Sequence, residues 1–209
     1  MIKAILFDMD GVLIEAKDWH YEALNRALKL FGYEISRYDH LITYDGLPTR
    51  RKLEMLSAEH NLPRELHEFI NEMKQRYTME LVHTHCKPRF VHEYALSNLK
   101  RQGYKLAVAS NSIRNTVQVM MAYACLDKYL DIMISNEDVK RAKPHPDMYQ
   151  KAMQCFGLQP HECMVVEDNE KGIVAAKASG AHIMVVKEVT DVNIDNISRH
   201  IAHIEGADA

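Results

Sequence analysis

The feature that constrains this chain most is an apolar run that ends in two closely spaced carboxylates. Residues Ala4 to Phe7 are apolar, and Asp8-Met9-Asp10-Gly11 follows them. A short, wholly apolar run is typical of a strand buried on both faces of a parallel sheet. Such sheets carry their reactive groups just beyond the carboxyl ends of the strands, and glycine suits a tight turn there. Two interpretations are open at this point: Asp8 and Asp10 form a reactive pair, or they belong to a polar turn.

The second half of the chain alternates helical and strand patterns. Three helical segments stop at Gly103, Gly157 and Gly180, each before a short apolar strand. The predicted strands cover residues 104–110, 132–134, 164–166 and 183–186. Helices that end in glycine just before a strand are typical of a doubly wound α/β fold with a parallel sheet.

Residues from about 15 to 82 show helical periodicity only. We therefore predict an α/β core domain made of residues 1–14 and 86–209, with a helical cap domain of residues 15–85 inserted after the first strand. An insert leaving from the strand that carries the two aspartates is expected to act as a lid. A short last helix is expected around Ile194 to Ile201, with a frayed tail beyond Glu205.

Composition excludes several classes of partner. The net charge is −3 and the sequence has no basic run, so nucleic acids and anionic membranes are poor partners. No apolar stretch approaches the length of a membrane span, and no signal peptide precedes the first strand. The four cysteines are widely spaced and are interpreted as reduced packing residues. We expect a cytoplasmic protein, as a monomer or a small homo-oligomer.

Polar residues follow three further predicted strands. Ser110 and Asn111 end one strand, Lys143 follows the next within ten residues, and Glu167 and Asp168 end a third. In an open parallel sheet these ends converge on the edge that carries the first two aspartates. Four carboxylates, a lysine and a hydroxyl are therefore expected in a small volume.

Charge indicates how such a cluster is stabilised. Carboxylates held close together require a cation or shifted pKa values, and oxygen ligands of this kind are those that Mg²⁺ prefers. A site balanced in this way is suited to an oxyanion, whose hydrogen bonds Ser110, Asn111 and backbone amides can supply.

The ordered set of motifs resembles the haloacid dehalogenase superfamily, in the helical-cap branch that includes β-phosphoglucomutase and phosphoglycolate phosphatase-like enzymes. The motifs are Asp8-Met-Asp10-Gly-Val, Ser110-Asn111, Lys143-Pro144-His-Pro146-Asp147 and Glu167-Asp168-Asn169. The resemblance covers nearly the whole chain and implies a Rossmann-like core. It also implies a role for each residue: Asp8 as nucleophile, Asp10 as general acid and base, and Ser110 and Lys143 on the transferred phosphoryl group. Asp168 with Glu167 is expected to support Mg²⁺, and Asp8 and Asp10 complete the expected set of metal ligands.

The activity expected from the resemblance is that of a Mg²⁺-dependent phosphatase, a phosphoric monoester hydrolase. Its substrate would be a small phosphorylated metabolite, most simply a sugar phosphate, hydrolysed through an aspartyl-phosphate. A phosphosugar mutase is the close alternative. A non-catalytic phospho-accepting module is a third, although it needs neither a lid nor Asp10. The acidic pair Glu167-Asp168 argues against a dehalogenase of the superfamily.

Candidate substrate contacts in the cap are His20, Thr49, Arg50 and Lys74, each of which could equally be a packing or surface residue. Thr49 stands where the mutase has an arginine for the second phosphate, and Arg50 comes one place later. Ala16 replaces a small hydroxyl residue of the mutase. Both departures favour a phosphatase.

His83, His85 and Cys86 lie together near the predicted hinge. Three potential ligands on one segment suggest a transition-metal site, but a closed site needs more ligands, and we do not expect a metal there.

Overall fold

The computed structural model describes residues 1–206 and consists of two compact units. One unit combines Met1–Glu15 with the chain from Lys87 onward, and the other is Ala16–Cys86. The remaining residues of the predicted tail, 207–209, lie outside the described part of the chain.

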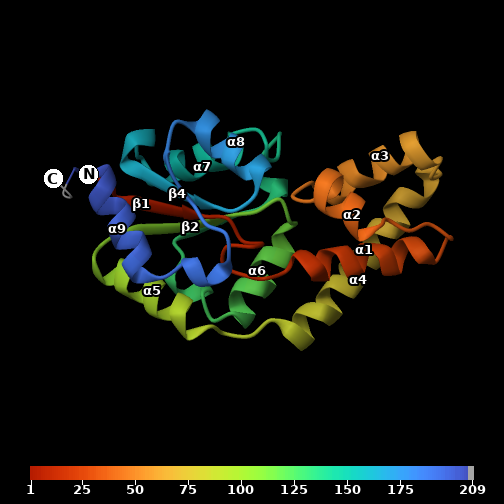
Figure 1. Ribbon diagram of the computed structural model, residues 1–209, viewed down its shortest axis with the longest axis horizontal. Helices are drawn as coiled ribbons and strands as arrows, with labels where there is room; N and C mark the ends of the chain where they lie inside the picture. The colour runs from red at the N-terminus through yellow and green to blue at the C-terminus, as the bar shows by residue number, and fades with distance from the viewer. Residues whose placement is uncertain (207–209) are drawn as a thin grey trace. The chain divides into compact units, whose positions relative to one another are not determined.

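The first unit contains a five-stranded parallel sheet (Figure 1). The order across the sheet is β3-β2-β1-β4-β5. The strands are β1 (Ala4–Phe7), β2 (Lys105–Ala109), β3 (Ile132–Ile134), β4 (Cys163–Glu167) and β5 (His182–Val185). β1 is central and every residue in it is buried, as the wholly apolar run predicts. The predicted doubly wound α/β class is confirmed.

Helices cover both faces of this sheet. In Figure 1, α7 (Asp147–Phe156) and α8 (Glu170–Ser179) lie on one side of the sheet. On the other side lie α5 (Phe90–Arg101), α6 (Arg114–Tyr123) and α9 (Ile194–Ile204). Short 3₁₀ turns occupy Asp127–Tyr129, Asn136–Asp138, Pro160–Glu162 and Val189–Asp191. Gly157 and Gly180 cap α7 and α8 in the left-handed conformation, as their positions predict.

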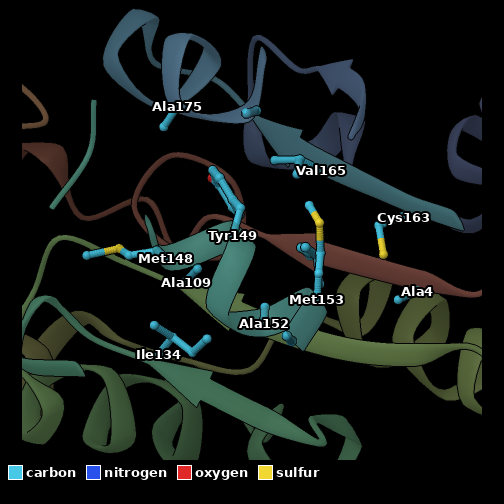
Figure 2. Packing of buried hydrophobic residues seen from close by; sticks show 13 residues of the cluster. Ala4, Ala109, Ile134, Met148, Tyr149, Ala152, Met153, Cys163, Val165 and Ala175 are labelled. Carbon is cyan, nitrogen blue, oxygen red and sulfur yellow. The ribbon is translucent and has the colours of Figure 1, made fainter. Parts of the chain in front are cut away.

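The core on the α7 side of the sheet combines small strand residues with large helix residues. Ala4, Ala107 and Ala109 leave room on the sheet for Tyr149 and Met153 of α7. Figure 2 shows Met153 directed towards β4, and the Tyr149 hydroxyl directed towards the side where Ala175 of α8 lies. α7 is thereby held close to the strands that carry the polar motifs.

The second unit is helical throughout its described residues. It contains α1 (Lys17–Lys29), α2 (Arg37–Asp39), a π-helical turn η1 (His40–Tyr44), α3 (Thr49–His60), a 3₁₀ turn η2 (Arg64–Leu66) and α4 (His67–His85). A cluster of apolar side chains forms its core: Leu24, Ala27, Leu28, Ile35, Tyr44, Leu53, Leu56, Leu62 and Ile70. The predicted helical cap is confirmed as a helical insert. Pro63 precedes the 3₁₀ turn, and the chain makes this one tighter turn before α4 begins. Among the described residues, no helix combines the length and apolarity that crossing a membrane requires.

His40 is a buried titratable residue of the second unit. Its side chain lies against the ring of Tyr21, with ring centroids 5.0 Å apart, and neither ring nitrogen has a hydrogen-bond partner among the described residues. Burial lowers the pKa of His40 to about 4, and the charge of Lys52 acts in the same direction. The folded protein therefore holds this histidine neutral at a pH where an unfolded chain would protonate it.

We predict that His40 makes the protein acid-sensitive. The pKa of His40 is lower in the folded state than in the unfolded chain, so stability is present above pH 6.5 and is lost as pH falls from 6.5 towards 4. Between pH 7 and pH 5, His40 should account for a loss of about 2 kcal/mol in the free energy of unfolding. Urea unfolding at several pH values should show a flatter pH dependence for His40→Gln than for the wild type. His60→Gln, at an exposed histidine, is the control and should keep the wild-type dependence. Identical pH dependence in His40→Gln and the wild type would contradict the assignment.

Candidate active site

The strand register places the polar residues that follow β1, β2 and β4 next to one another at the carboxyl edge of the sheet. Phe7 of β1 pairs with Val108 of β2 and with Val166 of β4. The next residues along these parallel strands therefore lie side by side, and Asp8 stands between the ends of β2 and β4. The Asp8 amide donates to Val166 O at 3.0 Å and continues the ladder to that point.

A tight turn follows Asp8. Met9 O accepts hydrogen bonds from the amides of Leu13 (3.0 Å) and Ile14 (2.9 Å), and the Gly11 amide donates to Ile14 O at 2.7 Å. Gly11 has φ +96°, a conformation that side chains other than glycine rarely adopt. The predicted turn is confirmed, and it presents Asp8 and Asp10 at the sheet edge. Their role as a reactive pair stays a prediction.

Lys143 links β1 to β4 through a buried ion pair with two carboxylates. Its Nζ atom lies 2.6 Å from Asp8 Oδ1 and 2.7 Å from Glu167 Oε1, and all three side chains are buried. Burial alone would lower the pKa of Lys143, but the charges of Asp8 and Glu167 outweigh it and raise this pKa above its usual value. The ammonium therefore remains charged at the centre of the site.

Three carboxylates form one group of potential metal ligands. Asp8, Glu167 and Asp168 each offer an oxygen atom, and these atoms lie within 4.8 Å of one another. Within residues 1–206 this is the one group of three or more acidic, histidine or cysteine side chains with such spacing. A donor set made of carboxylate oxygens fits Mg²⁺. The segment His83 to Cys86 forms no such group, and His85 instead stacks on Trp19 with centroids 6.0 Å apart.

The raised pKa of Asp8 also indicates a site suited to a cation. Burial raises the pKa of Asp8 well above its ordinary value; Lys143 opposes this shift, and Glu167, Asp10 and Asp168 add to it. Asp10 is thus close enough to influence Asp8, although its carboxylate does not belong to the three-residue group. Ser112 Oγ donates to Asp10 Oδ2 at 3.5 Å. A divalent cation held by the three carboxylates would favour the ionised form of Asp8.

Ser110 and Asn111 occupy different positions relative to this centre. Ser110 is buried at the end of β2, and its Oγ accepts a hydrogen bond from the Ser112 amide at 3.1 Å. The Asn111 side chain holds the main chain of Lys143: Nδ2 donates to Lys143 O at 3.1 Å, and Oδ1 accepts from Lys143 N at 3.0 Å. This geometry favours Asn111 as the residue that positions Lys143, whereas direct contact with phosphate stays a prediction.

The candidate residues of the helical unit differ in their environments. Lys74 is buried, and its Nζ lies 3.3 Å from His20 Nδ1. Thr49 is half-buried at the start of α3. The Arg50 side chain is 90% exposed and pairs with Glu54, which is the arrangement of a solvated helix start. Roles for these residues in substrate binding stay predictions.

Two residues of the site, Tyr149 and Gly172, are not among the candidates predicted from the sequence. In the sequence Tyr149 belongs to the apolar stripe of a helix, yet its hydroxyl donates to Glu167 Oε1 at 2.6 Å. Gly172 lies against the Glu167 carboxylate. A tyrosine within an apolar helical stripe was the available signal for Tyr149, because a buried tyrosine hydroxyl usually needs a hydrogen-bond partner.

Comparison with known proteins identifies the family. Residues 5–186 match the family of haloacid dehalogenase-like hydrolases. The chain belongs to this family. A pyrophosphatase PpaX from Anoxybacillus flavithermus is 30% identical over 184 residues, covering 86% of this chain and 80% of the relative. A phosphorylated carbohydrates phosphatase from Thermotoga maritima is 29% identical over 182 residues, covering 86% of this chain and 82% of the relative.

Solved structures of this haloacid dehalogenase-like fold are also similar to the chain. CbbY from Rhodobacter sphaeroides, in complex with phosphate, superimposes with a TM-score of 0.78 at 25% identity and covers 88% of this chain and 86% of its own. A β-phosphoglucomutase from Clostridium difficile gives a TM-score of 0.85 at 20% identity over 99% of this chain and 100% of its own, a likeness of fold. The predicted resemblance to this superfamily, and to a hydrolase of it, is confirmed.

We predict that Lys143→Met destabilises the core unit strongly. The substitution leaves Asp8 and Glu167 buried beside each other without their shared cation, a change that costs about 3–5 kcal/mol in the free energy of unfolding. Urea unfolding measures this loss. Lys128→Met removes an exposed lysine paired with Glu93 and should cost much less. Equal losses in the two variants would show that the buried pair contributes no more than a surface pair.

Proposed function

We propose that the chain is a Mg²⁺-dependent phosphatase that hydrolyses a small phosphorylated metabolite, a sugar phosphate, through an aspartyl-phosphate. The observation that carries the proposal is the buried contact of Lys143 with Asp8 and Glu167 at the strand ends. The family and the phosphatases among its relatives support phosphate-ester chemistry, and the phosphorylated carbohydrates phosphatase supports a sugar substrate.

The first chemical step assigned to these residues is attack by Asp8 on phosphorus. Lys143 holds Asp8 Oδ1, which leaves the other carboxylate oxygen to form the new O–P bond in line with the leaving oxygen. As the ester bond breaks, Asp10 donates a proton to the leaving oxygen. Lys143 and the Ser110 hydroxyl stabilise negative charge on the phosphoryl oxygens. An alcohol is released and the phosphoryl group remains on Asp8.

The second step returns the enzyme to its starting state. Asp10, now ionised, removes a proton from a water molecule that attacks the phosphorus of the aspartyl-phosphate. The bond between phosphorus and Asp8 breaks, and inorganic phosphate leaves. Asp8, Glu167 and Asp168 would hold Mg²⁺, which when bound supplies positive charge for the phosphoryl oxygens.

A phosphosugar mutase uses the same nucleophile. It must also bind both phosphates of its bisphosphate intermediate while that intermediate reorients in the site. Thr49 stands where the mutase branch has an arginine, and the neighbouring Arg50 is exposed and paired with Glu54. Lys52 and Lys74, two buried lysines of the helical unit, each carry a single ammonium, which does not replace a bidentate guanidinium. These observations favour hydrolysis over phosphoryl return.

We predict that Asp8→Asn abolishes turnover of an aryl phosphate while the protein stays folded. An amide cannot form the aspartyl-phosphate, and loss of an essential nucleophile lowers kcat by about 10⁴-fold or more in other hydrolases. Phosphate release and circular dichroism measure the two properties. Asp127→Asn, at an exposed aspartate of the same unit, should retain wild-type turnover. Substantial activity in folded Asp8→Asn would remove the nucleophile assignment.

We also predict that hydrolysis exceeds isomerisation. With β-glucose 1-phosphate as substrate, in the presence and absence of glucose 1,6-bisphosphate, free phosphate should form faster than glucose 6-phosphate. The physical reason is that the second phosphate of a bisphosphate is held weakly, so water reaches the aspartyl-phosphate first. Both products are followed in the same reaction. Rapid formation of glucose 6-phosphate with negligible free phosphate would instead identify a mutase.

A further inference from the structure

Tyr149 of α7 contacts both charged partners at the centre of the site. Its hydroxyl donates to Glu167 Oε1 at 2.6 Å, and Lys143 Nζ lies 4.8 Å from the centre of its ring. Lys143 also donates to the same Glu167 oxygen at 2.7 Å. Tyr149 is fully buried and rises from α7 towards α8 in Figure 2. The Tyr149 side chain therefore restrains both the Glu167 carboxylate and the Lys143 ammonium.

Both oxygens of the Glu167 carboxylate accept hydrogen bonds. Oε1 accepts from Tyr149 and Lys143, and Oε2 accepts from the backbone amides of Asp168 at 3.1 Å and Asn169 at 3.3 Å. Gly172 closes the remaining side in the first turn of α8, where a Cβ atom would overlap the carboxylate. Glycine is disfavoured inside a helix, so this close approach explains its presence.

We propose that Tyr149 is a positioning residue that fixes the Glu167 carboxylate and the Lys143 ammonium for Mg²⁺ binding, and that Gly172 provides the space this carboxylate occupies. The inference rests on the proposed function in one respect only, namely that Asp8, Glu167 and Asp168 bind Mg²⁺. The hydroxyl is separable from the packing of the core, since phenylalanine would fill the same space beside Met148 and Ala152 and keep an aromatic face beneath Lys143. Hydrogen bonds to the side chains that hold a metal orient those side chains, and their loss lowers metal affinity about 10–100-fold.

The test is the affinity for Mg²⁺ measured without substrate. Protein treated with chelator and dialysed is titrated with Mg²⁺ by isothermal titration calorimetry. Tyr149→Phe should raise the Kd for Mg²⁺ by about 10-fold or more. The Mg²⁺ concentration that gives half-maximal hydrolysis of an aryl phosphate should rise in parallel, whereas KM for the aryl phosphate at saturating Mg²⁺ should change little. Tyr94→Phe, at a half-exposed tyrosine of α5, is the matched control and should bind Mg²⁺ as the wild type does.

A second variant tests the same carboxylate from its other side. Gly172→Ala improves helix propensity but pushes against Glu167, so it should weaken Mg²⁺ binding at least as much as Tyr149→Phe while circular dichroism stays unchanged.

The outcomes separate this inference from the proposed function. Wild-type affinity in Tyr149→Phe would overturn the positioning role and leave the phosphatase proposal intact. Mg²⁺ binding that weakens as expected, in a wild type that releases no phosphate from any phosphorylated metabolite, would support the positioning role and overturn the phosphatase proposal. A wild type that does not bind Mg²⁺ would overturn the metal site and the role of Tyr149 together.

Discussion

The buried contact of Lys143 with Asp8 and Glu167 is the interaction on which the rest of the site depends. An ammonium and two carboxylates removed from water are stable only when each is paired closely and its remaining hydrogen bonds are met. The chain meets this condition with groups from several elements: Asn111 hydrogen-bonds the main chain of Lys143, Tyr149 lies against its ammonium, and two backbone amides just before α8 donate to Glu167. The same contacts that satisfy the buried charges also fix the positions of the reactive groups.

Much of this arrangement could be predicted from the sequence because it follows from the backbone. An apolar run before Asp8, and glycines that end α7 and α8, are local signals of strand and helix boundaries. Parallel strands end at one edge, so residues that follow them converge whatever their side-chain contacts are. The helical insert could also be predicted, because residues from about 15 to 82 show only helical periodicity.

Side-chain pairing could not be predicted in this way. Nothing in the local sequence shows that Tyr149 of α7 reaches Glu167 at the end of β4. Nor does it show that Gly172 of α8 contacts the same carboxylate. Arg50 shows the opposite case: an arginine near the expected position pairs with Glu54 one turn along its own helix and stays in solvent. Such choices depend on burial and on competing partners, which appear only in three dimensions.

The arrangement of the carboxylates gives similar groups different roles. Asp8, Glu167 and Asp168 share one small volume with Lys143. Three ionised carboxylates against one ammonium leave two negative charges, which a divalent cation would neutralise. Asp10 influences Asp8 but lies outside this group, beside the Ser112 hydroxyl. A carboxylate that binds a cation is a poor proton carrier, because the cation stabilises its ionised form. In the proposed mechanism a bound cation would keep Asp8 ionised as the nucleophile and leave Asp10, outside the three-carboxylate group, as the acid and base.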